Sequence, residues 1–505
     1  MSRPFWILAL FALSVSAVIA QERHYDLRLM VDVKPVATPV GTLVEGPELA
    51  RSPEGAVGML WVERGKGGEA LRVAEFDRAG GRWMTPGTVA VSRTLASETA
   101  GGGPRLAIGS RGRMAVVWTE EVSGAAGGGQ RAMLATSSDG GRSWTAPCAI
   151  SAGSEGSAWP SVAAKPGGGW TLAWIGRGPG GAAGGDLCFE ADEAAAGAVP
   201  SVLVAPVSLA SPALAGFEDG SSLVVYRGLT KEGAGDPIAV RVEEAGGRRL
   251  TQVGRARWMA AAPGVPAVML SRSGPLAAAS WYTAPDGEPR ILNSMTPDGG
   301  LRWTEAQRCD LGRAVGPVAV AILGDGSQLV LWTENPGSDI SMPGGTYLRR
   351  YAGSGASSMP ALIEPLPARG VPGPVRLAVL REGEGRRAEL LATIVRRGTG
   401  GRLSLRCLVL RLPAAAQLAL LDSDCKCGPG SLPGYPIRGR ILTVDANRAA
   451  LTIHHTAVPG LFRPGDLPVR VDPAMMRSLS PGREFLGRIE KKEGQWWLSE
   501  VRLFE

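Results

Sequence analysis

Two cysteines one residue apart are the side chains in this sequence best placed to bind a metal. Cys425 and Cys427 flank a lysine in a segment rich in glycine and proline. In an extended chain, residues i and i+2 point to the same side, so both thiolates can reach one ion. Thiolates suit soft or borderline ions, here Cu(I) or Zn(II). The same pair is also compatible with disulfides to other cysteines or with free thiols, and these alternatives stay open.

Histidine is too scarce for a triad mechanism over most of the chain. The three histidines are His24, His454 and His455, so a Ser-His-Asp site is not available between them. Adjacent residues of a strand face opposite sides, so one of His454 and His455 is expected to be packed and the other exposed. Walker-type and dinucleotide-binding glycine motifs are absent from the sequence. We predict no catalytic residue from these patterns.

A unit of about 55 residues recurs seven times. Each copy opens with a proline and a short apolar strand, and the prolines are spaced by 57, 56, 52, 54, 51 and 57 residues. A glycine-containing turn, a second apolar strand and further extended segments follow. Four strands per unit predict the blades of an all-β propeller. The seven prolines are Pro47, Pro104, Pro160, Pro212, Pro266, Pro317 and Pro374.

An aromatic side chain ends the second strand in six of the seven units. A residue that recurs in six blades serves what all blades share, so we interpret these aromatics as packing residues. The seventh copy, at 390–395, lacks the aromatic. The count favours seven blades, with six as the alternative, and segment 27–33 is expected to close the ring on the last blade. The aromatics are Trp61, Trp118, Trp174, Tyr226, Trp281 and Trp332.

Two turns match the pattern Ser/Thr-x-Asp-x-Gly-x-x-Trp. The hydroxyl and the carboxylate can accept backbone N–H bonds, glycine can adopt positive φ, and tryptophan can anchor the hairpin. The motif therefore predicts a structural turn and not a catalytic site. Weaker echoes occur at 76–83 and 243–250. The motif residues are Ser137, Asp139, Gly141 and Trp144 in one turn, and Thr296, Asp298, Gly300 and Trp303 in the other.

These turns resemble the Asp-box of sialidase-like and related BNR-repeat propellers, over roughly residues 26–421. A sialidase resemblance implies an exo-acting glycoside hydrolase with an arginine cluster, a tyrosine nucleophile paired with glutamate, and an aspartate acid/base. The family's first arginine lies in an Arg-Ile-Pro opening of the first blade, where this sequence reads Glu45-Gly46-Pro47. A carboxylate there would repel an acidic sugar. Tyr226, Tyr282 and Tyr347 are the candidate phenols, and packing explains them better than catalysis.

A second domain is predicted at residues 435–505, after a linker at 422–434. Its strands are expected at 435–445, 449–455, 485–490 and 496–502, which fit a small barrel of the OB type. The residue order resembles the periplasmic copper-binding domain of copper/silver efflux chaperones. That resemblance implies Cu(I) held by a histidine on the second strand, here His455, and by a Met-x-Met pair. The pair is missing from the corresponding loop at 463–468, so Cys425 and Cys427 would have to replace it.

The N-terminus indicates export. Arg3 precedes an apolar stretch at 4–19, and Val18 and Ala20 occupy the −3 and −1 positions of a cleavable signal peptide at 1–20. The propeller would then occupy 21–421 of a periplasmic or secreted protein without a further membrane span. The 54 basic and 47 acidic residues are spread along the chain, which argues against a nucleic-acid partner.

Two functions are compatible with these observations. The first is an exported non-catalytic propeller that binds a protein or glycan at one face and carries a copper-binding-like barrel. The second is a secreted glycoside hydrolase of the exo-α-sialidase type. Three convergent arginines and a Tyr–Glu pair at the propeller centre would favour the enzyme, and ordinary packed aromatics would favour the scaffold.

Overall fold

The computed structural model describes two parts of the chain, residues 31–412 and 435–504. Within them it leaves out short stretches at 66, 98–101, 123–128, 151–155, 177–184, 191–200, 231–232, 244–246, 255–267, 285–286, 337–342, 353–356, 359, 367–370, 383–387, 399, 456–464 and 493–494. The predicted signal peptide, His24, Cys425 and Cys427 lie outside the described residues. Among the described residues, no helix is long and apolar enough to span a bilayer.

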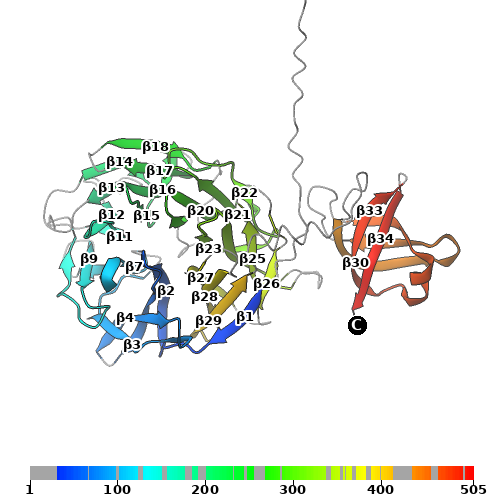
Figure 1. Cartoon of the computed structure of the whole chain (residues 1–505), viewed down its shortest axis with the longest axis horizontal. Helices are drawn as coiled ribbons and strands as arrows, with labels where there is room; N and C mark the ends of the chain where they lie inside the picture. Colours follow the sequence, from blue (N-terminus) through cyan, green and yellow to red (C-terminus); the bar gives the residue numbers. More distant parts are fainter. Residues whose placement is uncertain are drawn as a thin grey trace, which may run out of the picture.

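Strands β1 to β29 form antiparallel sheets around a common centre, which is the arrangement of a β-propeller (Figure 1). In the described part of the chain these strands group into seven blades, in agreement with the seven units of the sequence. The first three blades are β2 (Leu43–Arg51), β3 (Val57–Gly65), β4 (Gly68–Asp77), β5 (Arg82–Trp83) and β6 (Gly87–Ser92); β7 (Arg105–Ile108), β8 (Met114–Val122), β9 (Gly129–Ser137) and β10 (Cys148–Ala149); and β11 (Ser157–Ala164), β12 (Trp170–Gly176), β13 (Gly185–Glu190) and β14 (Ser201–Val207).

The remaining four blades follow in chain order. They are β15 (Ala213–Gly216), β16 (Ser222–Thr230), β17 (Gly233–Val242) and β18 (Arg248–Gln252); β19 (Met269–Ser273), β20 (Leu276–Thr283), β21 (Arg290–Thr296) and β22 (Gln307–Arg308); β23 (Ala314–Ile322), β24 (Gln328–Glu334), β25 (Gly345–Tyr351) and β26 (Ala361–Pro365); and β27 (Val371–Arg381), β28 (Ala388–Arg397), β29 (Leu403–Leu412) and β1 (Asp32–Val36). Val207 of β14 pairs with Gly228 of β16, so blades 3 and 4 share one continuous sheet.

The N-terminal strand closes the ring. Strand β1 pairs antiparallel with β29 over five residues, from Asp32 opposite Arg411 to Val36 opposite Cys407. The sequence predicts this closure, although the paired strand is 32–36 and thus lies further along the chain than the expected 27–33. Residues 27–30 lie outside the described part.

The propeller core is divided among the contacts between neighbouring blades. Each pair of adjacent blades encloses its own apolar cluster, and two clusters lie between blades 7 and 1. The recurring aromatics are wedges in these clusters, and each is at most 2% exposed. Their predicted packing role is confirmed. Because packing is concentrated between blades, the innermost strands are free to line a central cavity.

The C-terminal residues form a closed five-stranded barrel in the order β30-β31-β32-β34-β33. The strands are β30 (Tyr435–Asp445), β31 (Ala450–His455), β32 (Gly465–Val471), β33 (Glu484–Lys492) and β34 (Gln495–Phe504). The sequence prediction missed β32, because a proline inside a short strand weakens the strand signal and Pro468 lies in the middle of it. The expected loop at 463–468 is therefore wrong from Gly465 onward. The short 3₁₀ helices are η1 (Ser110–Gly112), η4 (Ala446–Arg448) and η5 (Pro473–Ser478).

Ring closure by β1 yields the first prediction. A mature chain that begins after Val36 loses five cross-strand pairs, which should lower the free energy of unfolding by about 2 kcal/mol or more. Urea unfolding monitored by tryptophan fluorescence measures the change. A chain that begins at Val31 keeps β1 and serves as the control. Equal stability of the two truncated chains would show that β1 does not close the ring.

Candidate functional site

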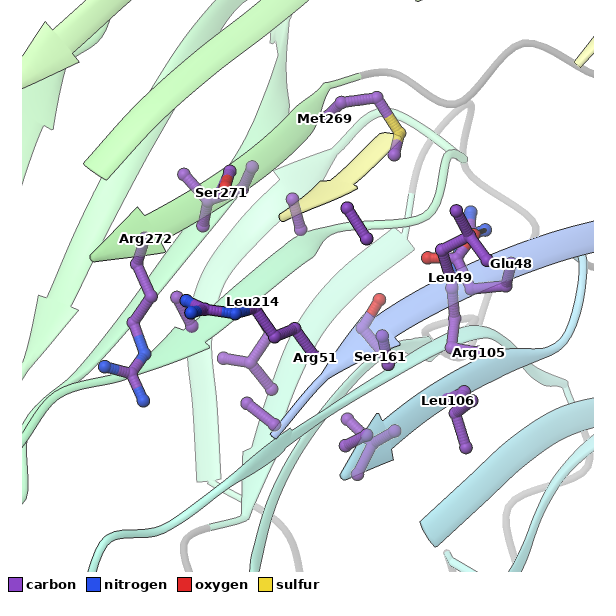
Figure 2. Close-up of a pocket in the computed structure, with 18 of the residues that line it drawn as sticks. Glu48, Leu49, Arg51, Arg105, Leu106, Ser161, Leu214, Met269, Ser271 and Arg272 are labelled. Atoms are coloured by element: carbon purple, nitrogen blue, oxygen red, sulfur yellow. Dashed lines mark hydrogen bonds and ion pairs between the residues drawn. The ribbon is translucent and has the colours of Figure 1, made fainter. Parts of the chain in front are cut away.

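The innermost strands of all seven blades line one cavity of about 250 Å³ at the propeller centre (Figure 2). Strand pairing shows which lining residues lie at the same height along the propeller axis. In six blades, one residue of the first strand pairs with the second-strand residue that directly precedes the recurring aromatic. We call this height the Glu48 level. These residues are Glu48, Arg105, Ser161, Ala213, Met269 and Ala319, and Arg376 lies at this level in the seventh blade.

Small side chains occupy the middle of the cavity. Two residues beyond the Glu48 level, five blades contribute alanine and one contributes Ser271 to the lining. A methyl group leaves space that a larger core side chain would fill, so the cavity stays open along the propeller axis. The alanines are Ala50, Ala107, Ala163, Ala215 and Ala378.

Glu48 is the centre of a charged cluster at one end of the cavity. Its Oε2 accepts hydrogen bonds from Arg105 Nη1 at 3.2 Å and from Arg376 Nε at 2.7 Å. The Arg376 side chain is 4% exposed and that of Glu48 16% exposed. Glu48 therefore joins three consecutive blades, since it lies in blade 1 and its partners lie in blades 2 and 7.

Two further arginines, Arg51 of β2 and Arg272 of β19, lie at the other end of the cavity (Figure 2). Arg51 is three residues beyond Glu48, which corresponds to about 10 Å along a strand. Burial lowers the pKa of both guanidinium groups. With four arginines and one glutamate, the charged lining carries a net charge of +3.

The two ends of the cavity open toward different faces of the propeller. The first and third strands of an antiparallel blade end at the same face, so Arg51 and Arg272 lie toward the face that carries the Asp-box turns. The second strands end at the opposite face, to which Glu48 is closer.

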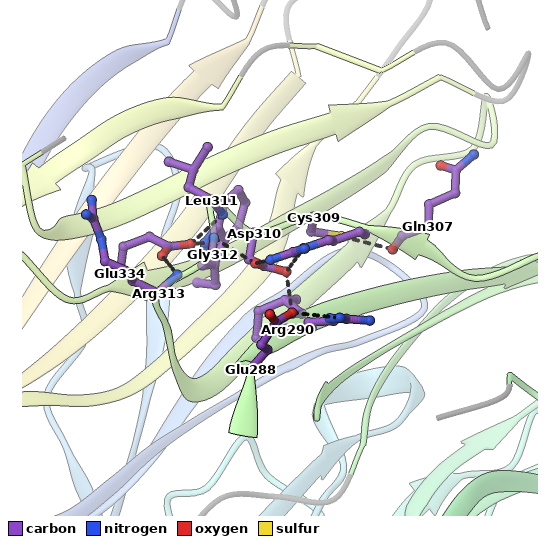
Figure 3. A network of polar contacts seen from close by, with 12 residues as sticks. Glu288, Arg290, Gln307, Cys309, Asp310, Leu311, Gly312, Arg313 and Glu334 are labelled. Carbon is purple, nitrogen blue, oxygen red and sulfur yellow. Dashed lines mark hydrogen bonds and ion pairs between the residues drawn. The ribbon is translucent and has the colours of Figure 1, made fainter. Parts of the chain in front are cut away.

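A polar network orders that opposite face between blades 5 and 6 (Figure 3). The Asp310 carboxylate, with its side chain fully buried, accepts bonds from the Ile291 amide at 2.7 Å, the Gly312 amide at 2.9 Å and the Arg308 guanidinium at 2.8 Å. Glu334 accepts bonds from the amides of Leu311 and Arg313, both at 2.8 Å. Burial raises the pKa of Glu334. Because internal donors occupy both carboxylates, the network holds the loop in place.

The acidic residues at the ends of second strands repeat one structural contact. In blades 1, 2 and 6 the glutamate accepts a hydrogen bond from the indole Nε1 of the tryptophan two residues earlier. Glu63 in addition accepts a bond from the Gly41 amide and pairs with Arg72. These glutamates fix the wedge tryptophans. The pairs are Trp61–Glu63 at 3.0 Å, Trp118–Glu120 at 3.1 Å and Trp332–Glu334 at 2.6 Å.

The candidate phenols do not line the cavity. Tyr226 is 2% exposed, and burial raises its pKa to about 12. Tyr347 is buried and donates its hydroxyl to the Pro343 carbonyl at 2.7 Å. Burial, and to a smaller extent the Asp310 charge, raises the pKa of Tyr282. Glu45, which replaces the expected family arginine, is not part of the lining either.

Both Asp-box turns fold as the motif predicts. The Gly141 amide donates to Ser137 Oγ at 2.9 Å, and Asp139 Oδ1 accepts the Ser143 amide at 2.9 Å. In the second turn the Gly300 amide donates to Thr296 Oγ1 at 2.8 Å, and Asp298 Oδ1 accepts the Arg302 amide at 2.9 Å. Bonds from Ser143 and Ser137 hold the pKa of Asp139 well below its usual range.

The Asp-box tryptophans fasten the turns to the structure. Trp144 Nε1 donates to the Gly141 carbonyl at 3.1 Å, and its ring packs against the cluster between blades 1 and 2. Trp303 Nε1 donates to Thr251 Oγ1 at 3.2 Å, and Thr251 belongs to the outer strand of blade 4. Gly141 and Gly300 have φ of +80° and +98°, which a residue with a side chain rarely adopts. These turns are structural joints between blades.

In the barrel, the two histidines face opposite sides as expected. His455 is 3% exposed, whereas His454 is exposed and its Nδ1 lies 2.6 Å from Asp466 Oδ1. Met475 and Met476 pack against the barrel core. Among the described residues, no group of three His, Cys, Asp or Glu side chains is placed to hold a metal ion.

The cysteines of the propeller are not paired. Cys148 is exposed, whereas Cys188, Cys309 and Cys407 are buried, and all four are free thiols. Burial raises the pKa of Cys188 to about 11 and that of Cys309 and Cys407 to about 12. Disulfides are therefore not what holds the described blades together.

The charged lining residues were not recognised from the sequence. Arg105 lies within a repeated proline-containing first strand, and Arg51 directly follows the apolar residues of another. A charged residue in an otherwise apolar first strand was the sequence signal that could have indicated the cavity. The residue at the Glu48 level follows the repeat proline by one position in blades 1 to 4, but by two in blades 6 and 7, where the pairing register shifts. A simple alignment on the prolines therefore places Val375, and not Arg376, next to Glu48.

No protein-family model matches this sequence, and no curated protein matches it. Among solved structures, the chain is similar to a protein of unknown function from Dyadobacter fermentans, with 12% identity and a TM-score of 0.46 over 76% of this chain and 99% of that one. It is also similar to the GH93 α-L-arabinofuranosidase of Fusarium graminearum, with 11% identity and a TM-score of 0.42 over 75% and 96% of the two chains. A Hadza microbial sialidase is 13% identical, with a TM-score of 0.40 over 72% and 65%.

The Glu48 cluster yields the second prediction. Glu48→Gln leaves two partly buried guanidinium groups without their carboxylate, which should lower the free energy of unfolding by about 3 kcal/mol. Chemical denaturation of the mature protein measures the loss. The exposed Glu121→Gln removes the same charge and should change stability by less than about 0.5 kcal/mol. Equal stability of the two variants would contradict the assigned role of Glu48.

Proposed function

We propose that this chain is an exported, non-catalytic propeller that binds a protein or glycan ligand at one of its faces. The signal peptide predicted at residues 1–20 supports the location, and the central cavity supports a binding site. The proposal makes the seven blades a rigid frame for a ligand, with the barrel as an attached second domain.

One observation carries the proposal. Glycoside hydrolysis needs two carboxylates, or a phenol activated by a carboxylate, on either side of the scissile bond. The lining of the central cavity holds one carboxylate, Glu48, and no tyrosine, aspartate, histidine or cysteine among the described residues. Glu48 is already bonded to Arg105 and Arg376. The described lining can therefore attract and orient a ligand, but it offers no pair of groups for proton transfer.

The third prediction separates binding from hydrolysis. The mature protein should release no sugar from fluorogenic sialosides or α-L-arabinofuranosides above the rate in buffer, and it should retain at least one ligand on a glycan or peptide array. Product fluorescence and array binding are the measurements. Sugar release that Tyr282→Phe abolishes would establish the alternative, a glycoside hydrolase, and would end the binding-only proposal.

For the barrel, Cu(I) binding stays a prediction of the sequence. It now depends on Cys425 and Cys427, because Met475 and Met476 serve the barrel core. Soft thiolates provide the affinity for Cu(I), and His455 is the nitrogen donor that the resemblance implies.

The fourth prediction concerns the number of Cu(I) ions that the mature chain binds. A competition titration with a chromophoric Cu(I) chelator under reducing conditions measures it. We expect one Cu(I) per mature chain and its loss in the Cys425→Ser/Cys427→Ser variant. His455→Ala should weaken binding, whereas exposed His454→Ala is the matched control and should not. If the mature protein leaves all Cu(I) with the chelator, the barrel has no copper function.

A further inference from the structure

Two arginines at the Asp-box end of the central cavity, Arg51 and Arg272, carry positive charges that nearby carboxylates neutralise only in part. Arg51 Nη2 lies 3.6 Å from Glu382 Oε1, which is longer than a normal hydrogen bond. The other oxygen of Glu382 accepts a bond from the Gly324 amide at 2.6 Å. Arg51 Nε is buried and has no hydrogen-bond partner among the described residues. Glu382 is therefore an incomplete counterion for Arg51.

Arg272 reaches the same end of the cavity from blade 5 (Figure 2). The charges that act on it include those of Arg51 and of Glu218, an exposed residue. Burial lowers the pKa of Arg272, and the Arg51 charge lowers it further, while Glu218 opposes the shift. Two like charges that act on each other in a partly buried cavity favour an anion between them.

The lining beside these two arginines is apolar. Three residues beyond the Glu48 level, blades 3 and 4 contribute Ala164 and Gly216 to the lining. A Cβ on Gly216 would lie 2.6 Å from the Ala164 carbonyl oxygen, so glycine permits the close approach of these two strands. Apolar Ile108, Ile322 and Val379 complete the lining at this level. The result is an apolar wall interrupted by two guanidinium groups.

We propose that Arg51 and Arg272 bind an oxyanion, a carboxylate or a phosphate, at the mouth of the central cavity on the Asp-box face. The proposal rests on the proposed function and specifies the charged group of its ligand. Guanidinium groups bind both kinds of oxyanion through paired charge-assisted hydrogen bonds. The bound anion would give Arg51 Nε a partner, and it would compete with Glu382. The Glu48 end, about 10 Å away along the strands, would contact another part of the ligand.

The fifth prediction concerns anion binding by the mature protein. Isothermal titration calorimetry with inorganic phosphate and, separately, with glucuronate measures it. At least one probe should bind with one site per chain, and the stronger probe distinguishes a phosphate from a carboxylate ligand. Arg51→Gln and Arg272→Gln should each weaken binding about tenfold or more, because each removes charged hydrogen bonds. Glu382→Gln should strengthen binding, because it removes the competing carboxylate.

Matched variants keep the result specific. Arg142→Gln removes one positive charge from an exposed position on the same face and should leave the affinity unchanged. Arg272→Lys retains the charge and should restore part of the affinity. Far-ultraviolet circular dichroism and the unfolding midpoint confirm that each variant is folded.

Three outcomes would overturn the inference: no binding of either probe, an affinity in Arg51→Gln and Arg272→Gln that is unchanged from that of the parent protein, or an equal loss of affinity in Arg142→Gln. These outcomes are distinct from failure of the proposed function. A protein that binds neither probe but retains a neutral ligand on the array still supports a binding propeller. Hydrolysis of the glycosides would contradict the proposed function itself.

Discussion

A ring of blades keeps its shape only if the last blade is fastened to the first. Here the pairing of β1 with β29 provides that joint through the backbone. Side chains reinforce it: Glu48 of blade 1 bonds Arg376 of blade 7, and Arg78 of blade 1 donates to the Leu380 carbonyl of blade 7 at 2.7 Å. Glu48 and Arg376 also belong to the lining of the central cavity. The seam between blades 7 and 1 and the charged lining of the cavity therefore share these two residues.

The cavity follows from how the core is distributed. Tryptophans such as Trp61 and Trp332 fill the space between blades, where they gain the most apolar burial. Alanines such as Ala50 and Ala163 then suffice along the axis. The charged residues divide into two groups with different surroundings. Glu48 is satisfied by two arginines, whereas Arg51 retains a buried donor without a partner. The Glu48 end of the cavity therefore has a structural role, whereas the Arg51 end is the one we propose to bind an anion.

The repeat architecture was predictable because its signals are local. Proline at the start of each first strand, an aromatic at the end of the second and the Asp-box turns around Asp139 and Asp298 all act within a few residues. The cavity was not predictable, because its members come together from seven distant strands. Arg376 meets Glu48 across the seam only after a register shift in β27 that no local pattern reports. Strand β32 was missed for a local reason, the proline at its centre.

The buried thiols have a consequence for redox chemistry. Thiol–disulfide exchange proceeds through the thiolate, and burial keeps Cys188, Cys309 and Cys407 protonated well above neutral pH. They lie in three different parts of the ring and cannot exchange without unfolding. An oxidising compartment therefore leaves these three buried thiols unchanged, and a reducing compartment removes no disulfide from the described blades. In the described propeller, these three thiols keep the same covalent state on either side of a membrane.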